Sequence, residues 1–511
     1  MVLKVLMMVL FFAVTIAIGF FTRKSATDVD GFVLGSRKVG PWLSAFAYGT
    51  SYFSAVVFIG YAGQFGWKYG MAALWIGLAN AFLGSLLAWY VLGARTRAMT
   101  HHLGAQTMPE FFGSRFNSHA LRIAAAGIIF VFLIPYTASV YNGLSRLFFM
   151  AFALPYEWVI IVMALLTCVY VVLGGYMATA VNDFVQGCIM LMGIIAVIAA
   201  VLAGHGGFTQ AVITLSQVPN DTPGTAGMAG AFTSIFGPDL INLLGVIILT
   251  SLGTWGLPQM VQKFYAIRST SSIKRGAIIS TVFALVVAGG SYFLGGFGRL
   301  VAPSVATTPD GTPIYDSVVP TLLASMPDLL IGLTVVLVLS ASMSTLSSLV
   351  LTSSSTLTLD LIKARFVKGM SQRAQLISIR ALIVVFVIIS AVIALVQYNS
   401  SVTFIAQLMS ISWGALAGAF LAPLLYGLYW KRVTTASVWA SFIFAVGLVC
   451  SNMVFGFIAS PINAGAIAML GGLVIVPLVS LITPAPDADK VGRLFAESYA
   501  NLHEYPIDAD D

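Results

Sequence analysis

Thirteen apolar segments, each about as long as a bilayer is thick, follow one another along this chain of 511 residues. An α-helix of about 20 apolar residues crosses the hydrocarbon core. Only 8% of the residues are charged, whereas a soluble globular chain carries about 25% to cover its water-facing surface. The segments are apolar throughout, unlike the alternating strands of an outer-membrane barrel. The sequence therefore predicts an all-α polytopic membrane protein with about 13 transmembrane helices. They lie near residues 3–21, 41–66, 70–93, 121–147, 157–175, 180–204, 236–260, 273–299, 327–361, 376–397, 402–429, 433–457 and 463–483.

The basic residues gather in alternate connections between these segments. If the N-terminus lies outside, 21 of the 25 Lys and Arg residues fall in the inward-facing connections and the adjoining segment ends. Lys263 is one of these 21. The exceptions are Lys4, Lys68, Arg146 and Arg299. Cytoplasmic loops of membrane proteins carry such an excess of positive charge. The pattern predicts a plasma-membrane protein, of the bacterial inner membrane, with its N-terminus outside and its C-terminus cytoplasmic. The net charge of +7 thus indicates membrane topology and no nucleic-acid partner.

Two segments contain helix-interrupting residues at mid-membrane depth. The second segment carries Gly49-Thr50-Ser51, and the seventh ends at Gly256-Leu257-Pro258. Broken helices free backbone carbonyls that can coordinate Na⁺. Since these segments lie five apart, they predict two inverted five-helix repeats, about 41–204 and 236–429, with a binding site between them. A small-residue packing face in the second segment and a plain helix end in the seventh remain as alternatives.

The ninth segment is rich in hydroxyl groups. Ser344, Ser347, Ser348 and Thr352 share one helix face, and Thr345 lies at its edge. Hydroxyl oxygens are hard, neutral ligands that an alkali cation accepts in place of water. Alternatively, such hydroxyls bond to their own helix and allow close packing.

Asp183 begins an apolar segment, the sixth. A carboxylate inside a membrane is costly and normally has a cation or another partner. At the membrane surface, however, an aspartate is also an ordinary helix N-cap.

Enzymatic and ATP-driven functions have no support in the sequence. There is no phosphate-binding GxxxxGK[ST] loop, no HExxH motif and no paired cysteine site, because Cys168, Cys188 and Cys450 stand alone. Repeated ionisable residues within the segments, as in a proton pump, are also missing. The sequence predicts a secondary active transporter and no enzyme, with residues 1–483 as a single transmembrane domain. The polar stretch 484–511 is predicted to be a mobile cytoplasmic tail.

Several motifs, in order along nearly the whole chain, resemble the sodium:solute symporter family. They are Phe32–Arg37 with Gly40, Tyr52–Gly63, Gly174–Asp183 with Gln186, Gly256–Tyr265, Ser344-Thr345, and Leu428–Trp430 before Arg432. The resemblance implies a LeuT-type fold, in which segments 2–6 and 7–11 form the inverted repeats. It also implies that Na⁺ is the coupling ion and that the protein works as a monomer.

The same resemblance implies two sodium sites. The main site would use the backbone carbonyls of Thr50, Phe53 and Ala341 and the hydroxyls of Ser344 and Thr345. An additional site, present in some members, would use Ser344 again, together with Asp183, Ser347 and Ser348. Whether one or two ions are coupled to transport is left open by the sequence.

The resemblance places the substrate between segments 2, 4, 7 and 11. The candidate substrate residues, each of which could instead serve helix packing, are Tyr52, Ser54, Tyr136, Thr250, Thr254, Trp255 and Trp413. These residues offer aromatic and hydroxyl groups but no Lys or Arg to bind an anion. They favour a small, partly apolar solute with a carboxylate, and helix ends and Na⁺ would stabilise the charge of that carboxylate.

Pantothenate, proline or a monocarboxylate fits this description. Proline permease has an aspartate where this chain has Tyr52, and Gln64 and Gln407 are the only nearby amides, which disfavours a sugar. The alternatives are a sodium/sugar or sialic acid symporter, and a non-transporting membrane sensor of the same fold.

Overall fold

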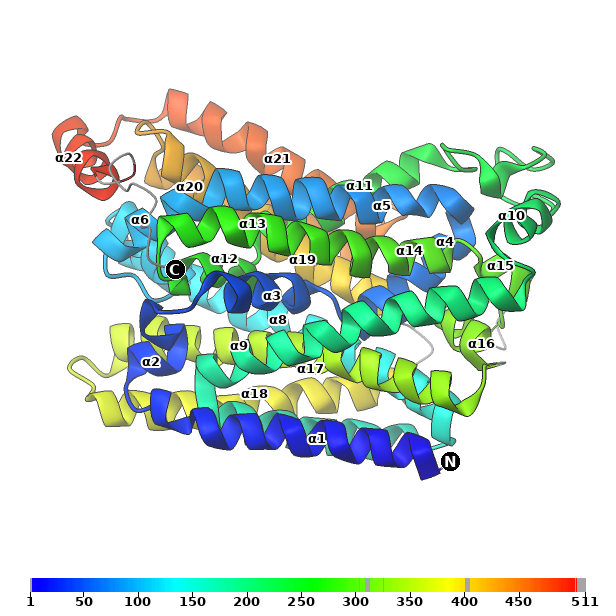
Figure 1. Ribbon diagram of the computed structural model, residues 1–511. Coiled ribbons are helices and arrows are strands. Elements are labelled where there is room, and N and C mark those ends of the chain that lie inside the picture. Colours follow the sequence, from blue (N-terminus) through cyan, green and yellow to red (C-terminus); the bar gives the residue numbers. More distant parts are fainter. Residues whose placement is uncertain are drawn as a thin grey trace.

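The computed structural model describes residues 2–302, 304–307, 313–324, 326–399, 405–500 and 502. Within these residues the chain forms helices and no β-strand, so the predicted all-α fold is confirmed (Figure 1). Ten helices are long and apolar enough to cross a membrane, or eleven if one bent pair counts as a span. Residues 402–404 of the eleventh predicted segment, and residues 501 and 503–511 of the predicted tail, lie outside the described part.

Two of these helices are too long for a single crossing. Val56–His102 and Tyr156–Gly204 contain 47 and 49 residues, and a straight helix of that length would measure about 70 Å, over twice the hydrocarbon core. The backbone leaves the helical conformation at Gly70 (φ 59°, ψ −135°) and at Gly175 (φ 53°, ψ −143°). A division at these glycines leaves room for thirteen crossings, which stays a prediction.

Gly175 must be a glycine for two reasons. Its positive φ is strained for any residue with a Cβ, and a Cβ there would lie 2.7 Å from the carbonyl oxygen of Phe32. Helix α2 therefore packs directly against the bend in α9.

The first half of the chain runs from the N-terminal helix to the loop near residue 230. Its helices are α1 (Val2–Thr22), η1 (Arg23–Ser25), α2 (Val29–Leu34), η2 (Gly35–Arg37), α3 (Pro41–Tyr52), η3 (Val56–Tyr61), α4 (Ala62–Tyr69), η4 (Gly70–Ala73), α5 (Leu74–Ala79), η5 (Asn80–Leu87), η6 (Trp89–Gly93), α6 (Ala94–His102), α7 (Met108–Arg115), α8 (His119–Phe152), α9 (Tyr156–Gly204), α10 (Phe208–Ser216) and η7 (Ala231–Thr233).

The second half holds the other bent helix and the C-terminal helices. These are α11 (Leu240–Gly256), α12 (Pro258–Ala266), α13 (Thr270–Ala284), η8 (Leu285–Gly289), α14 (Gly290–Gly295), α15 (Gly298–Val301), η9 (Tyr315–Ser317), α16 (Val318–Ala324), α17 (Asp328–Thr356), η10 (Leu357–Phe366), α18 (Gln372–Asn399), α19 (Ile405–Tyr429), α20 (Thr435–Phe455), α21 (Pro461–Ile482) and α22 (Ala488–Tyr499).

Both predicted helix breaks exist, but one lies elsewhere. Helices α11 and α12 meet at Leu257 with a bend of 43°, within the predicted Gly256-Leu257-Pro258. Helix α3 continues through Thr50 and Ser51 and opens at Phe53 (φ −89°, ψ 117°), so the prediction of a break at residues 49–51 is wrong. The hydroxyls of Thr50 and Ser51 donate to carbonyls one turn back, which accommodates them in the helix.

The hydroxyl-rich helix α17 lies in the centre of the bundle. It packs against α1, α3, α8, α9 and α18, and every residue from Thr334 to Thr356 is buried, whereas most of α1, at the edge, is not. The Ser and Thr side chains of α17 therefore face other helices rather than lipid.

The described chain begins and ends at opposite ends of the bundle. In Figure 1 the N-terminal end of α1 lies at the right, and α22 lies at the left, near α6. Part of the predicted tail forms helix α22, which buries Val491 and Phe495; the mobility of the tail stays a prediction. The last residue of α22, Tyr499, donates a hydrogen bond of 2.8 Å to the carbonyl of Leu428.

Candidate functional site

The break in α3 meets the centre of α17, where five oxygen-bearing residues come together. Thr345 Oγ1 lies 3.2 Å from the carbonyl oxygen of Thr50, 3.1 Å from that of Phe53 and 3.1 Å from that of Ala341. Ser344 Oγ donates to Thr50 Oγ1 over 2.7 Å. All five residues are buried. The structure thus brings together every residue predicted for the main sodium site.

This oxygen cluster follows from the extended conformation at Phe53. Because α3 ends there, the backbone carbonyls of its last turn have no hydrogen-bond donor within the helix. Those of Thr50 and Phe53 accept from Thr345 on α17 instead. The chain is fixed there by a further contact, because the amide of Ala55 donates to Ser342 Oγ over 3.0 Å. Converging carbonyl and hydroxyl oxygens can replace the hydration shell of an alkali cation without a buried carboxylate.

The residues predicted for the additional site lie close by on α9 and α17. Asp183, Ser347 and Ser348 are all buried. Ser347 Oγ donates to the carbonyl of Ser344 over 2.8 Å and so bonds to its own helix. Neither carboxylate oxygen of Asp183 has a hydrogen-bond partner among the described residues.

Lys263 also lies at this second cluster, which the sequence did not predict. The charge count assigned it to an inward-facing connection, but the structure buries it on α12, with only 2% of it exposed. Its Nζ donates to Ser348 Oγ over 3.2 Å. The available signal was its position inside the apolar run after Pro258, rather than beyond that run's end.

Four of the predicted substrate residues lie together at the break in α3, namely Tyr52, Ser54, Tyr136 and Trp413. Tyr136 donates to the carbonyl of Tyr52 over 3.3 Å, next to Ser54, and its ring meets that of Trp413 edge-on at 5.8 Å between centroids. The Tyr52 hydroxyl and the Trp413 Nε1 are buried without a hydrogen-bond partner in the described part of the chain. Buried polar groups normally have partners, so both can bind a ligand.

The three candidates on α11 have other contacts. Thr250 Oγ1 donates to its own helix at Val246, 2.9 Å away. Thr254 Oγ1 and Trp255 Nε1 donate to the carbonyls of Gly84 and Leu83, over 2.8 and 2.9 Å. These contacts fix α11 against η5, and a direct role of the three residues in substrate binding stays a prediction.

Two tyrosines missed at the sequence level belong to the same region. Tyr61, on η3, lies 2.7 Å from Ser410 Oγ through its hydroxyl. The hydroxyl of Tyr292, on α14, is buried without a partner among the described residues. Tyr61 falls within the motif Tyr52–Gly63, which was the signal for it. Tyr292 has no such signal, because only the packing of α14 brings it here.

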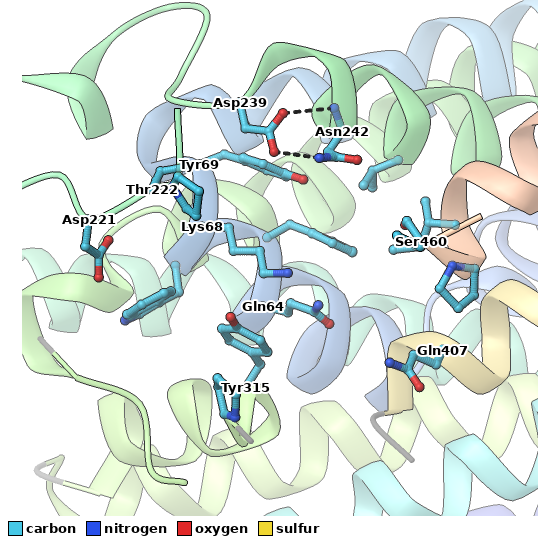
Figure 2. A pocket seen from close by; sticks show the side chains of 18 of the residues that line it. Gln64, Lys68, Tyr69, Asp221, Thr222, Asp239, Asn242, Tyr315, Gln407 and Ser460 are labelled. Atoms are coloured by element: carbon cyan, nitrogen blue, oxygen red, sulfur yellow. Dashed lines mark hydrogen bonds between the residues drawn. The ribbon is translucent and has the colours of Figure 1, made fainter. Parts of the chain in front are cut away.

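A cavity of about 570 Å³ opens at the end of the bundle where the predicted outer loops meet. Figure 2 shows Gln64, Lys68, Tyr315 and Gln407 among the residues that line it, so the two amides noted in the sequence belong to the same cavity. Lys68 Nζ lies 4.6 Å from the centre of the Tyr315 ring. At the rim, Asn242 Nδ2 donates to Asp239 over 2.6 Å.

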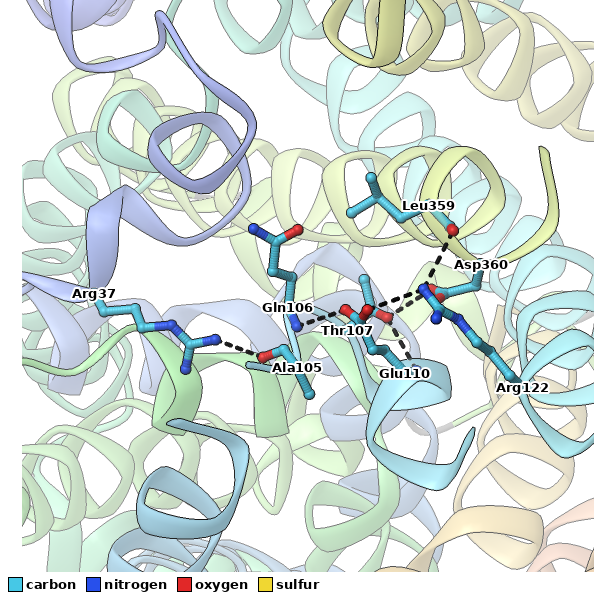
Figure 3. A network of polar contacts seen from close by, with 8 residues as sticks. All are labelled: Arg37, Ala105, Gln106, Thr107, Glu110, Arg122, Leu359 and Asp360. Carbon is cyan, nitrogen blue, oxygen red and sulfur yellow. Dashed lines mark hydrogen bonds and ion pairs between the residues drawn. The ribbon is translucent and has the colours of Figure 1, made fainter. Parts of the chain in front are cut away.

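A polar network joins distant segments at the opposite end (Figure 3). Arg122, at the start of α8, donates from Nε to Asp360 over 2.7 Å and from Nη2 to Glu110 over 3.1 Å. Thr107 donates to the other oxygen of Asp360 over 2.5 Å. Asp360 is fully buried at the end of the hydroxyl-rich helix, in η10. This network connects α7 and α8 with the far end of α17, and no pattern in the sequence predicted it.

Known proteins resemble this chain over most of its length. The family model of the sodium:solute symporter family matches residues 32–444. The sodium/proline symporter of Salmonella typhimurium is 28% identical over 505 residues, with 96% of this chain and 95% of the relative covered. The osmoregulated proline transporter OpuE of Bacillus subtilis is 27% identical over 495 residues, covering 95% and 96%.

A solved structure has the same fold. The substrate-bound, outward-open state of a Na⁺-coupled sialic acid symporter superimposes with a TM-score of 0.74 at 17% identity, covering 94% of this chain and 98% of that one. The predicted LeuT-type fold is thereby confirmed. Because the family model matches residues 32–444, which is most of the chain, the protein belongs to the sodium:solute symporter family.

Proposed function

We propose that this protein is a sodium-coupled secondary active symporter that imports a small organic solute bearing a carboxylate. The observation that carries the proposal is the oxygen cluster of Thr50, Phe53, Ala341, Ser344 and Thr345 between α3 and α17. A Na⁺ ion there would bind both helices and stabilise the arrangement in which they meet. Bound solute would then permit the change to the inward-facing state, which is alternating access.

The driving force is the sodium gradient. Each Na⁺ that enters with the membrane potential contributes about 2.3 kcal/mol per 100 mV, in addition to its concentration gradient. The protein would work as a monomer in the bacterial inner membrane, with its N-terminus outside. The repeats would be residues 41–204 and 236–429, each beginning with one broken helix.

The solute would bind at Tyr52, Ser54, Tyr136 and Trp413, with α11 closing the site beside them. Proline is the first candidate, since proline symporters are the relatives named above. Tyr52, where proline permease carries an aspartate, favours testing pantothenate and short monocarboxylates alongside it. The additional cluster at Asp183 and Ser348 is proposed as a second cation site, and its occupant is considered below.

The test uses purified protein in proteoliposomes. Uptake of labelled proline, pantothenate, lactate and sialic acid is measured with an inward gradient of Na⁺ or of K⁺. Accumulation of a carboxylate solute with Na⁺ alone is expected. Equal uptake with K⁺ would reject sodium coupling, and sialic acid as the accumulated solute would favour the alternative substrate class. Binding without uptake of any solute would favour a sensor.

Lys68 should attract the solute into the outer cavity. Replacement by methionine keeps the length of the side chain and removes the ammonium beside Tyr315. We expect the KM for the carboxylate solute to rise roughly tenfold, about 1.4 kcal/mol of lost attraction, while kcat stays within about twofold. Lys368→Met, at an exposed lysine on the other side, is the matched control. An unchanged KM in Lys68→Met would contradict this role.

A further inference from the structure

We propose that the ammonium of Lys263 is the resident cation of the Asp183–Ser348 cluster and takes the place of a second Na⁺. The symporter would then couple one Na⁺, held at the main site, to each solute molecule. This inference rests on the proposed function and specifies its stoichiometry.

The geometry places the ammonium where a cation ligand set would otherwise converge. Lys263 Nζ donates to Ser348 Oγ over 3.2 Å, and Ser348 Oγ lies 3.0 Å from Ser51 Oγ. The same ammonium lies 5.1 Å from the centre of the Tyr176 ring, whose negative face favours a cation. Three elements, α3, α9 and α17, therefore enclose the end of this side chain.

The charges of the cluster balance without a metal ion. Asp183 is fully buried, and neither of its oxygens has a hydrogen-bond partner among the described residues. Lys263 supplies the opposite charge nearby. One carboxylate and one ammonium are neutral together, whereas an added Na⁺ would leave an uncompensated positive charge in a region of low dielectric.

The position of Lys263 also connects the two broken helices. It lies on α12, directly after the break at Leu257, while Ser51 lies on the last turn of α3 before the break at Phe53. Ser348 on α17 contacts both. A lysine fixed to the chain, unlike a free ion, stays with α12 through the transport cycle and keeps this cluster closed to Na⁺.

The inference is tested by equilibrium binding of ²²Na⁺ to the purified protein in lipid nanodiscs, which needs no solute. We expect one Na⁺ per wild-type molecule and two per molecule of Lys263→Met, because methionine removes the ammonium and leaves Asp183 without a cation. The double variant Lys263→Met/Asp183→Asn should return to one. Lys368→Met, which removes an exposed lysine elsewhere, should bind one.

If Lys263→Met fails to fold, the single variant Asp183→Asn still tests whether Asp183 holds a second Na⁺. A second Na⁺ held by Asp183 in the wild type would make this variant drop from two ions to one, whereas we expect one ion in both. Two ions in the wild type, or one ion in a folded Lys263→Met, would overturn the inference and leave sodium symport intact. No bound Na⁺ in the wild type would reject the proposed function, and this inference with it.

Discussion

Replacement of both Ser344 and Thr345 by alanine should abolish sodium-coupled uptake. The double variant removes two of the five oxygens between α3 and α17, and it deprives the carbonyls of Thr50 and Phe53 of their partner. At about 1.5 kcal/mol for each lost ligand, the affinity for Na⁺ should fall at least about 100-fold. The measurements are the initial rate of solute uptake under a Na⁺ gradient and the Na⁺ concentration that gives half of the maximal rate.

Ser355→Ala is the matched control on the same helix. The hydroxyl of Ser355 is buried as well, but it donates to Leu351, one turn back in α17. Its loss should change the half-maximal Na⁺ concentration less than about threefold, since a bond within one helix contributes little. Normal uptake by Ser344→Ala/Thr345→Ala would place the ion elsewhere and remove the main site from the mechanism.

Arg122→Ala should be the most destabilising single change proposed here. It removes the cation that faces two carboxylates, those of Asp360 and Glu110, and leaves Asp360 buried with Thr107 as its remaining partner (Figure 3). An uncompensated buried charge costs about 3–5 kcal/mol. We expect a melting temperature several degrees lower in detergent, together with slow uptake, since the network joins α7 and α8 to the end of α17.

A second variant separates lost charge balance from lost packing. In Arg122→Ala/Asp360→Asn the buried carboxylate is gone, so most of the lost thermal stability should return. Uptake should remain slow, because the connection between α8 and η10 is still missing. A melting temperature of Arg122→Ala equal to that of the wild type would show that the network does not hold these segments together.

The sequence predicted those features that depend on local pattern. Apolar runs about as long as the bilayer is thick predict the membrane helices. The helical repeat places Ser344, Ser347 and Ser348 on one face, and all three are buried in α17, at the centre of the bundle. The proline of Gly256-Leu257-Pro258 ends α11 by its own chemistry. These features need no knowledge of which helices are neighbours.

The features that escaped prediction depend on contacts between distant segments. Helix α3 opens at Phe53 rather than at Gly49, and the amide of Ala55 is bound there by Ser342, nearly 300 residues away. From the sequence alone, Lys263 is assigned to a connection at the membrane surface, whereas the bend before α12 places it inside the bundle. The same holds for Tyr499 of α22, because no local pattern reveals its partners, Arg95 on α6 and Leu428 on α19.

The neutral oxygens at the α3–α17 crossing have an electrical consequence. A carrier whose ion site holds no fixed charge, and whose neighbouring Lys263 and Asp183 cancel, returns empty across the membrane with no net charge in its centre. With a zwitterionic solute such as proline, the membrane voltage then acts on the loaded step alone, where the ion itself is the moving charge. Hyperpolarisation should accordingly accelerate the inward current with proline, leave the return of the empty carrier unaffected, and produce no current with a monovalent anion such as lactate, whose charge cancels that of the ion.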